Sequence, residues 1–113
     1  MLPMGATKSD IFTDDQNTIA TFAKAFGHPA RVAILQHLFQ INTCVCGDLV
    51  KVIGLAQATI SQHLKELKNL GLIKGTVEGT SVCYCINYNN WAKMKTIMLE
   101  FLDQDINSPY QCC

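Results

Sequence analysis

The sequence is poor in charged residues, which make up 16% of its 113 residues, and its nine basic residues balance nine acidic ones. A net charge of zero does not exclude a nucleic-acid partner, but any basic surface must then be local. No apolar run approaches membrane-spanning length, and the first residues lack the long apolar segment of a secretory signal. We therefore expect a cytoplasmic protein with no membrane partner.

The sequence also lacks the arrangements that indicate catalysis. It has no Ser/His/Asp arrangement, no phosphate-binding loop and no pair of acidic residues at a catalytic helical spacing. We therefore do not expect an enzyme. Cysteine, in contrast, occurs six times. Because disulfides are rare in cytosolic proteins, these cysteines are expected to be free, metal-binding or redox-active.

The stretch from residue 55 to residue 86 organises the chain. Its apolar residues recur at helical spacing and predict one buried stripe, formed by Leu55, Ile60, Leu64, Leu67 and Leu70. The other face carries side chains that can bind base edges and phosphates, namely Gln57, Thr59, Ser61, Gln62, His63, Lys65 and Lys68. Gly71 is placed to end this helix. Two apolar runs, 72–77 and 81–86, then predict a hairpin whose turn, including Thr80, would touch the neighbouring DNA backbone or minor groove.

Around this stretch the sequence predicts one domain, residues 12–106, between a flexible arm at 1–11 and a cysteine-containing tail at 107–113. Helices are expected after a cap at Thr13 or Asp14, from Pro29, over residues 46–53, and after a cap at Asn89 or Asn90. The fold class is therefore mainly α with a small β-hairpin, a winged helix-turn-helix in the order α-α-α-α-β-β-α. The apolar last helix favours a homodimer in which it packs with the first helix, although it could fold back on its own domain.

Two segments resemble a known family. The run from Ala25 to Leu35, and the run from Thr59 to Leu67 followed by Gly71-Leu72-Ile73, resemble the ArsR/SmtB family of small metal-responsive repressors. The resemblance covers about residues 19–86. It implies a winged-helix homodimer that binds double-stranded operator DNA and releases it when an inducer binds.

The segment Cys44-Val45-Cys46-Gly47-Asp48-Leu49 resembles the Cys-Val-Cys-Asp-Leu element of the arsenic, antimony, cadmium and lead sensors in that family. It departs from the element by an inserted glycine and by the absence of a third cysteine near Val50 or Lys51. The last helix contains no histidine, so the family's zinc site of Asp, His and Glu is not expected. The resemblance implies a thiophilic inducer, arsenite or antimonite first, with cadmium, lead or zinc as alternatives.

Cys44 and Cys46 alone cannot complete a trigonal or tetrahedral site, so further sulfur ligands are expected from Cys112 and Cys113 of the tail. At the start of a helix, where Cys44 is still extended, the sulfurs of Cys44 and Cys46 can converge. Cys83 and Cys85 alternate along a strand and project to one face, outward if Val82, Tyr84 and Ile86 face the core. These two cysteines could ligate, form a redox-sensitive pair, or only pack.

Two alternatives to a metal-responsive repressor remain open at this stage. A thiol redox or persulfide sensor of the same fold would oxidise the same cysteines. A winged-helix module could instead bind protein and not DNA. Among the histidines, His28 is expected at a helix cap or turn, His37 on a helix surface, and His63 on the DNA-reading face.

Overall fold

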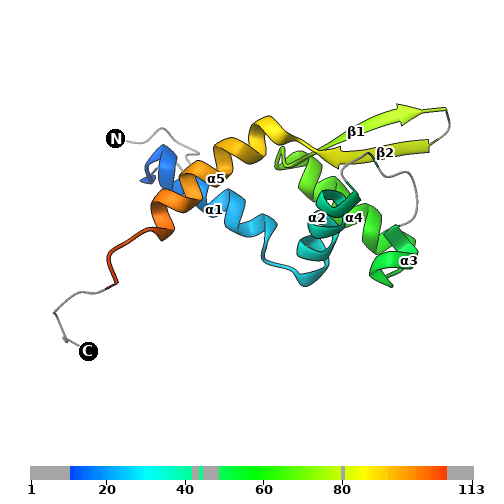
Figure 1. Ribbon diagram of the computed structural model, residues 1–113, viewed down its shortest axis with the longest axis horizontal. Coiled ribbons are helices and arrows are strands. Elements are labelled where there is room, and N and C mark those ends of the chain that lie inside the picture. Colours follow the sequence, from blue (N-terminus) through cyan, green and yellow to red (C-terminus); the bar gives the residue numbers. More distant parts are fainter. Residues whose placement is uncertain (1–10, 42–43, 45–48, 80, 107–113) are drawn as a thin grey trace.

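The computed structural model describes residues 11–41, 44, 49–79 and 81–106. The predicted arm, apart from Ile11, and the predicted tail with Cys112 and Cys113 lie outside these residues, as do Cys46 and Thr80. The described elements run in the predicted order (Figure 1): α1 (Asp14–Ala25), α2 (Pro29–Ile41), α3 (Leu49–Ile53), α4 (Gln57–Asn69), β1 (Ile73–Glu78), β2 (Ser81–Ile86) and α5 (Tyr88–Leu102). The mainly helical fold with one hairpin is thus confirmed.

Polar groups close both ends of α1. The Thr13 backbone N–H donates to Gln16 Oε1 (2.9 Å), while the Gln16 N–H donates to Thr13 Oγ1 (3.1 Å), forming a capping box. At the other end, the Arg31 guanidinium of α2 donates to the carbonyl oxygens of Ala25 (3.1 Å) and Lys24 (2.8 Å). Arg31 therefore satisfies carbonyl groups that lack a partner within α1 and fixes the angle between α1 and α2.

The second helix, α2, lies at the centre of the fold. His28 caps it, since the Ala30 N–H donates to His28 Nδ1 (3.0 Å), as the sequence predicts. One face of α2 packs on α3, α4 and β2, and its buried residues join a core made of Ile34, Leu38, Ile60, Leu67, Leu72 and Cys83. On α1, Ala25 is the buried alanine, whereas Ala23 is exposed.

The reading helix α4 ends at Gly71, which has a φ of +80°. The Leu72 N–H donates to the Leu67 carbonyl (3.1 Å) and the Gly71 N–H to the Lys68 carbonyl (3.0 Å), which closes the helix with a left-handed residue. The chain then enters the antiparallel hairpin directly, with Ile73 opposite Ile86 and Lys74 opposite Cys85. The predicted hairpin is confirmed, with β1 beginning at Ile73 and not Leu72.

The cap of α5 differs from the prediction. Asn87, not Asn89 or Asn90, caps the helix by accepting from the Asn90 N–H (3.3 Å). The Asn90 side chain turns instead to the end of α4, where Nδ2 donates to the Gly71 carbonyl (2.9 Å). Capping requires the residue just before the first turn. Since β2 ends at Ile86, as the apolar run 81–86 indicates, and α5 already begins at Tyr88, Asn87 takes that position.

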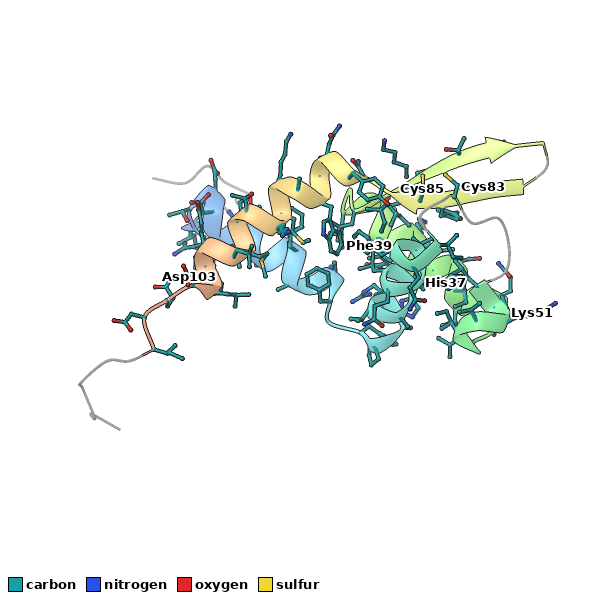
Figure 2. All side chains as sticks on the ribbon, in the orientation of Figure 1. His37, Phe39, Lys51, Cys83, Cys85 and Asp103 are labelled. Atoms are coloured by element: carbon teal, nitrogen blue, oxygen red, sulfur yellow. The ribbon has the colours of Figure 1, made fainter. Side chains whose placement is uncertain are left out.

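The aromatic side chains gather where α5 meets α1 and α2. Trp91 of α5 lies edge-to-face against Phe39 of α2, with ring centroids 4.7 Å apart, and against Phe26 at 6.0 Å. Phe39, which Figure 2 shows beneath α5, also contacts Tyr88 at 6.2 Å. Edge-to-face aromatic pairs contribute about 0.5–1.5 kcal/mol beyond their buried area. This cluster therefore fixes the first half of α5 on the helical core.

The second half of α5 remains largely uncovered. It lies beside α1 of the same chain (Figure 1), but from Leu99 onward its apolar residues are exposed to solvent. Leu99 is 54% exposed and Leu102 66% exposed, and both line a groove of about 430 Å³ with Glu100 and Asp103. Ile11 and Phe12, just before α1, are exposed as well. No helix in the described part of the chain has the length and apolar character needed to cross a membrane.

Candidate DNA interface and thiol cluster

The outer face of α4 exposes most of the side chains that the sequence predicts at a DNA interface. Buried Ile60, Leu64 and Leu67 fix the opposite face in the core. Neighbouring polar side chains on the outer face are already paired one turn apart, Gln57 Nε2 with Ser61 Oγ (3.1 Å) and Gln62 Nε2 with Glu66 Oε1 (3.4 Å). The exposed members of the predicted set are Gln57, Thr59, Ser61, Gln62, Lys65 and Lys68.

Basic groups continue from α4 onto the wing, the hairpin formed by β1 and β2. Lys65, Lys68 and Lys74 are all exposed. The Lys68 ammonium lies over Gly75 of β1, where a Cβ atom would come within 3.3 Å of Nζ. Because phosphate contacts supply most of the affinity of DNA-binding proteins, this local basic surface can compensate for the zero net charge of the chain.

The structure corrects the placement of His63. This side chain is only 8% exposed and packs against His28, with ring centroids 4.4 Å apart and the rings tilted by 51°. Its Nδ1 atom is buried and has no hydrogen-bond partner among the described residues. His63 follows Ile60 by three positions, which is the spacing of the buried face. It therefore cannot contact a base edge from this position. His37, predicted on the surface, is half-buried, and its Nε2 atom is buried without a partner in the described part of the chain.

The burial of His63 predicts a pH-dependent stability. Burial, followed by the neighbouring His28 and Arg31, lowers the pKa of His63 below its usual value of 6.5, and Glu66 opposes this shift. Below about pH 6.5 the unfolded chain binds a proton at His63 more readily than the folded chain does. The free energy of unfolding is therefore highest above about pH 6.5 and falls as the pH drops below it. Each unit of lowering corresponds to about 1.4 kcal/mol. We expect His63→Gln to flatten this fall in urea unfolding midpoints measured between about pH 7.5 and 5. An equally steep fall in the variant would contradict the assignment.

The wing presents an apolar pair near its tip. Val77 of β1 and Val82 of β2 lie opposite each other and are 73% and 42% exposed. Thr80, predicted to touch DNA at the turn, lies outside the described residues. Val77 belongs to the stretch 76–81 that the sequence predicts to touch DNA, and its side chain is exposed there.

The sequence predicted that the cysteines of β2 face outward if Val82, Tyr84 and Ile86 face the core. The structure does not show this arrangement. Cys83 is fully buried and Ile86 is 3% exposed, while Val82, near the turn of the hairpin, is exposed. The twist of a two-stranded ribbon turns the face of Cys83 toward the helices. Cys83 is disulfide-bonded. Cys44 and Cys85 are free thiols, Cys44 exposed and Cys85 half-buried.

The two free thiols meet. Cys85 makes a side-chain hydrogen bond with Cys44, which comes from the segment between α2 and α3. This hydrogen bond, together with burial, raises the pKa of the Cys85 thiol, whereas the Lys74 ammonium on the paired strand opposes the rise. Sequence reasoning singled out Cys44 and Cys85 separately and missed their contact, because they come from distant segments.

The metal ligands predicted from the sequence are only partly described. Of Cys44, Cys46, Cys112 and Cys113, the structure describes Cys44 alone. No group of three or more His, Cys, Asp or Glu side chains able to hold a metal ion occurs within the described ranges. Two adjacent thiols are nevertheless a donor set that soft ions such as Cd²⁺ prefer, so the described residues fit part of such a site.

A short helix, a turn, an exposed polar helix and a two-stranded wing define a winged helix-turn-helix DNA-binding domain. Residues 28–74 match the family model described as a bacterial regulatory protein of the arsR family. The chain belongs to this ArsR/SmtB family of transcriptional regulators. The membership confirms the resemblance given by the sequence, and it confirms that the chain is a regulator and not an enzyme.

Three relatives illustrate the family. An uncharacterized HTH-type transcriptional regulator from Methanocaldococcus jannaschii is 41% identical over 59% of this chain and 75% of its own length. A homolog of the cadmium resistance transcriptional regulatory protein CadC from Staphylococcus aureus is 36% identical over 71% of this chain and 66% of its own length. The structure of the cadmium metal-sensor CmtR from Mycobacterium tuberculosis aligns with a TM-score of 0.53 at 26% identity, covering 83% of this chain and 96% of that one. The chain thus spans about two thirds to three quarters of the length of the first two relatives.

Proposed function

We propose that this protein is a homodimeric, cytoplasmic repressor that binds operator DNA through α4 and releases it when a thiophilic ion binds at cysteines near the start of α3. The observation that carries the proposal is the position of Cys44, a free thiol in the segment that leads into α3 and thus into the helix-turn-helix. A ligand that moves this segment acts directly on the support of the reading helix. Couplings of roughly 1–3 kcal/mol are typical of such switches.

In this proposal Gln57, Thr59, Ser61 and Gln62 enter the major groove, and Lys65 and Lys68 lie near phosphates. Exposure of all these side chains on one helical face supports the assignment. Glutamine can pair with adenine through two hydrogen bonds, so the glutamines are the natural base-reading side chains. Thr80 would add a contact from the wing. Buried His63 is no longer included.

The exposed apolar surface of α5 supports the homodimer. Leu99 and Leu102 are exposed in a groove, and Ile11 and Phe12 add apolar surface before α1. A twofold partner that packs the same surfaces against each other would bury all of them. Two copies would also present two reading helices, as a palindromic operator requires.

The inducer follows from thiolate chemistry. Cys44 and Cys46, resembling the family's soft-ion element, favour arsenite or antimonite from the sequence alone, with Cys112 and Cys113 as further candidate ligands. The relatives named for cadmium favour Cd²⁺. Both kinds of ion bind thiolates strongly, because soft ligands select soft ions. We place Cd²⁺ first and test arsenite in parallel.

One observation favours a second candidate, a thiol redox sensor of the same fold. Cys83 is disulfide-bonded, and the Cys44 and Cys85 thiols are in contact. Oxidation of such a pair would remove two electrons and two protons and would need an oxidant in the cell.

Fluorescence anisotropy of a labelled duplex from the protein's own promoter tests these candidates. We expect salt-dependent binding of the reduced protein and release on addition of about one equivalent of Cd²⁺ per site, with Cys44→Ser remaining bound. Release by arsenite at lower concentration would make arsenite the inducer. Release by peroxide but by neither ion would establish the redox sensor. Absence of binding to any palindrome from that promoter would reject the repressor.

A further inference from the structure

The wing and the start of the helix-turn-helix approach each other at two free thiols. Cys85 lies on β2, directly opposite Lys74 of β1. Cys44 lies between Ile41, the last residue of α2, and Leu49, the first of α3. The hydrogen bond between the two thiols joins segments that are distant in the sequence. Figure 2 shows Cys83 and Cys85 on β2, on the side of the strand that lies nearest to α2.

The surroundings hold Cys85 in place. Its strand packs on α2, and its neighbours on the same strand, Cys83 and Ile86, are buried in the core. Cys85 itself is half-buried, so its thiol can be reached from solvent. Cys44 is exposed and lies outside the helices and strands, so it can adjust to a ligand. One fixed thiol and one adjustable thiol are a suitable pair for capturing an ion.

We propose that Cys85 of the wing and Cys44 before α3 are paired thiolate ligands of the inducing ion, which thereby connects the wing to the helix-turn-helix. This inference rests on the proposed function as a thiophilic-ion sensor. It assigns a wing residue to the sensing site, where the sequence pointed to the C-terminal tail for the additional sulfur. Cys83 contributes no free thiol, because it is already disulfide-bonded.

The chemistry balances without a redox partner. One Cd²⁺ ion displaces the two thiol protons and forms two Cd–S bonds, so two protons are released and no electrons are transferred. Water or donors outside the described residues complete the coordination of the ion, which usually takes four ligands in sites of this kind.

An ion that bridges Cys44 and Cys85 would have a direct effect on DNA binding. The wing carries exposed Lys74, and the Lys68 ammonium of α4 lies over Gly75 of the same strand. Drawing the segment before α3 onto β2 would therefore shift α3 relative to α4 and the wing. The ion would change the relative position of two parts that must contact one duplex together.

The test is a Cd²⁺ titration of the full-length protein, prepared without reductant so that the Cys83 disulfide stays intact, and followed by the ultraviolet absorption of the thiolate-to-cadmium charge transfer. We expect Cys85→Ser to lower this absorption and to weaken Cd²⁺ binding by at least the 10- to 100-fold that loss of an outer-shell partner typically costs. Cys44→Ser, at an exposed position outside regular structure, should have the same effect without disturbing the fold. Val82→Ser, on the opposite face of β2, is the matched control and should bind Cd²⁺ as the unmodified protein does.

The outcomes separate this inference from the proposed function. If Cys85→Ser keeps full absorption and affinity while the double variant Cys112→Ser/Cys113→Ser loses both, the tail supplies the sulfur and the wing assignment is wrong. If Cd²⁺ binds at Cys44 and Cys85 but leaves the operator complex intact, the site stands and the proposed function fails. If Cys85→Ser does not fold by circular dichroism, Cys44→Ser decides. Joint protection of both thiols from alkylation by Cd²⁺ then supports the pair, and unequal protection rejects it.

Discussion

Leu99→Asp and Leu102→Asp are each expected to convert the protein into a monomer and to lower its affinity for a palindromic operator by about 100-fold or more. Both leucines are exposed at the end of α5 and line the same groove. In a dimer they would be buried, and an unpaired carboxylate there would be strongly destabilising. A dimer also binds its second half-site from within the complex, at a high effective concentration. A monomer loses this gain entirely, which makes the expected effect the largest of all the variants.

Sedimentation velocity and operator anisotropy, measured at the same protein concentrations, test this expectation. Lys93→Asp is the matched control, because Lys93 is exposed on the same helix but lies on the opposite side from Leu102 by its spacing. The control should remain dimeric. If the leucine variants stay dimeric, or if the operator affinity falls with no change in mass, α5 is not the dimer interface.

Gln62→Ala should weaken operator binding by about 5- to 150-fold, which corresponds to the roughly 1–3 kcal/mol of a good pair between a side chain and a base. Gln62 is exposed in the middle of α4, and its amide is held one turn away by Glu66 at 3.4 Å. The variant should also lose discrimination at one base pair in each half-site. Competition binding to operators with single base-pair changes measures this loss directly.

Two further variants separate base reading from other effects. Gln36→Ala removes another exposed glutamine, on α2, and should leave operator binding unchanged. Lys65→Ala should weaken binding to all sequences alike. It should also lower the slope of log affinity against log salt concentration by about one, since one phosphate contact is lost. A uniform loss for Gln62→Ala across all operators would assign it to phosphate contact and remove it from the reading set.

The helices and the hairpin could be predicted because their signals are local. Caps such as Thr13, stops such as Gly71 and the apolar spacing of Ile60, Leu64 and Leu67 act within a few residues of where they stand in the sequence. His63 was misplaced because its polar character was given more weight than its spacing from Ile60. Packing on His28 decides its position, and His28 lies in the turn just before α2, far from His63 in the sequence.

The thiol contact could not be predicted in the same way. Cys44 and Cys85 meet only after α2, α4 and the hairpin have packed, and no local pattern encodes their distance. The sequence pointed to Cys112 and Cys113 of the tail for a further ligand, and it left Cys85 open between ligation, oxidation and packing. The position of β2 beside α2 is what brings Cys85 to Cys44.

The hydrogen bond from Asn90 to the Gly71 carbonyl has a consequence for which operators the protein can recognise. It attaches the end of the reading helix to the helix that carries the exposed leucines, and a Cβ atom at Gly71 would come within 2.9 Å of Asn90 Nδ2. The contact therefore leaves little freedom for α4 to pivot independently of α5. In a twofold assembly, the phase between the two half-sites, about one turn of the duplex or 34 Å, would be set by how the α5 helices meet. Related proteins with the same reading residues could thus choose different operators simply by packing α5 at a different angle.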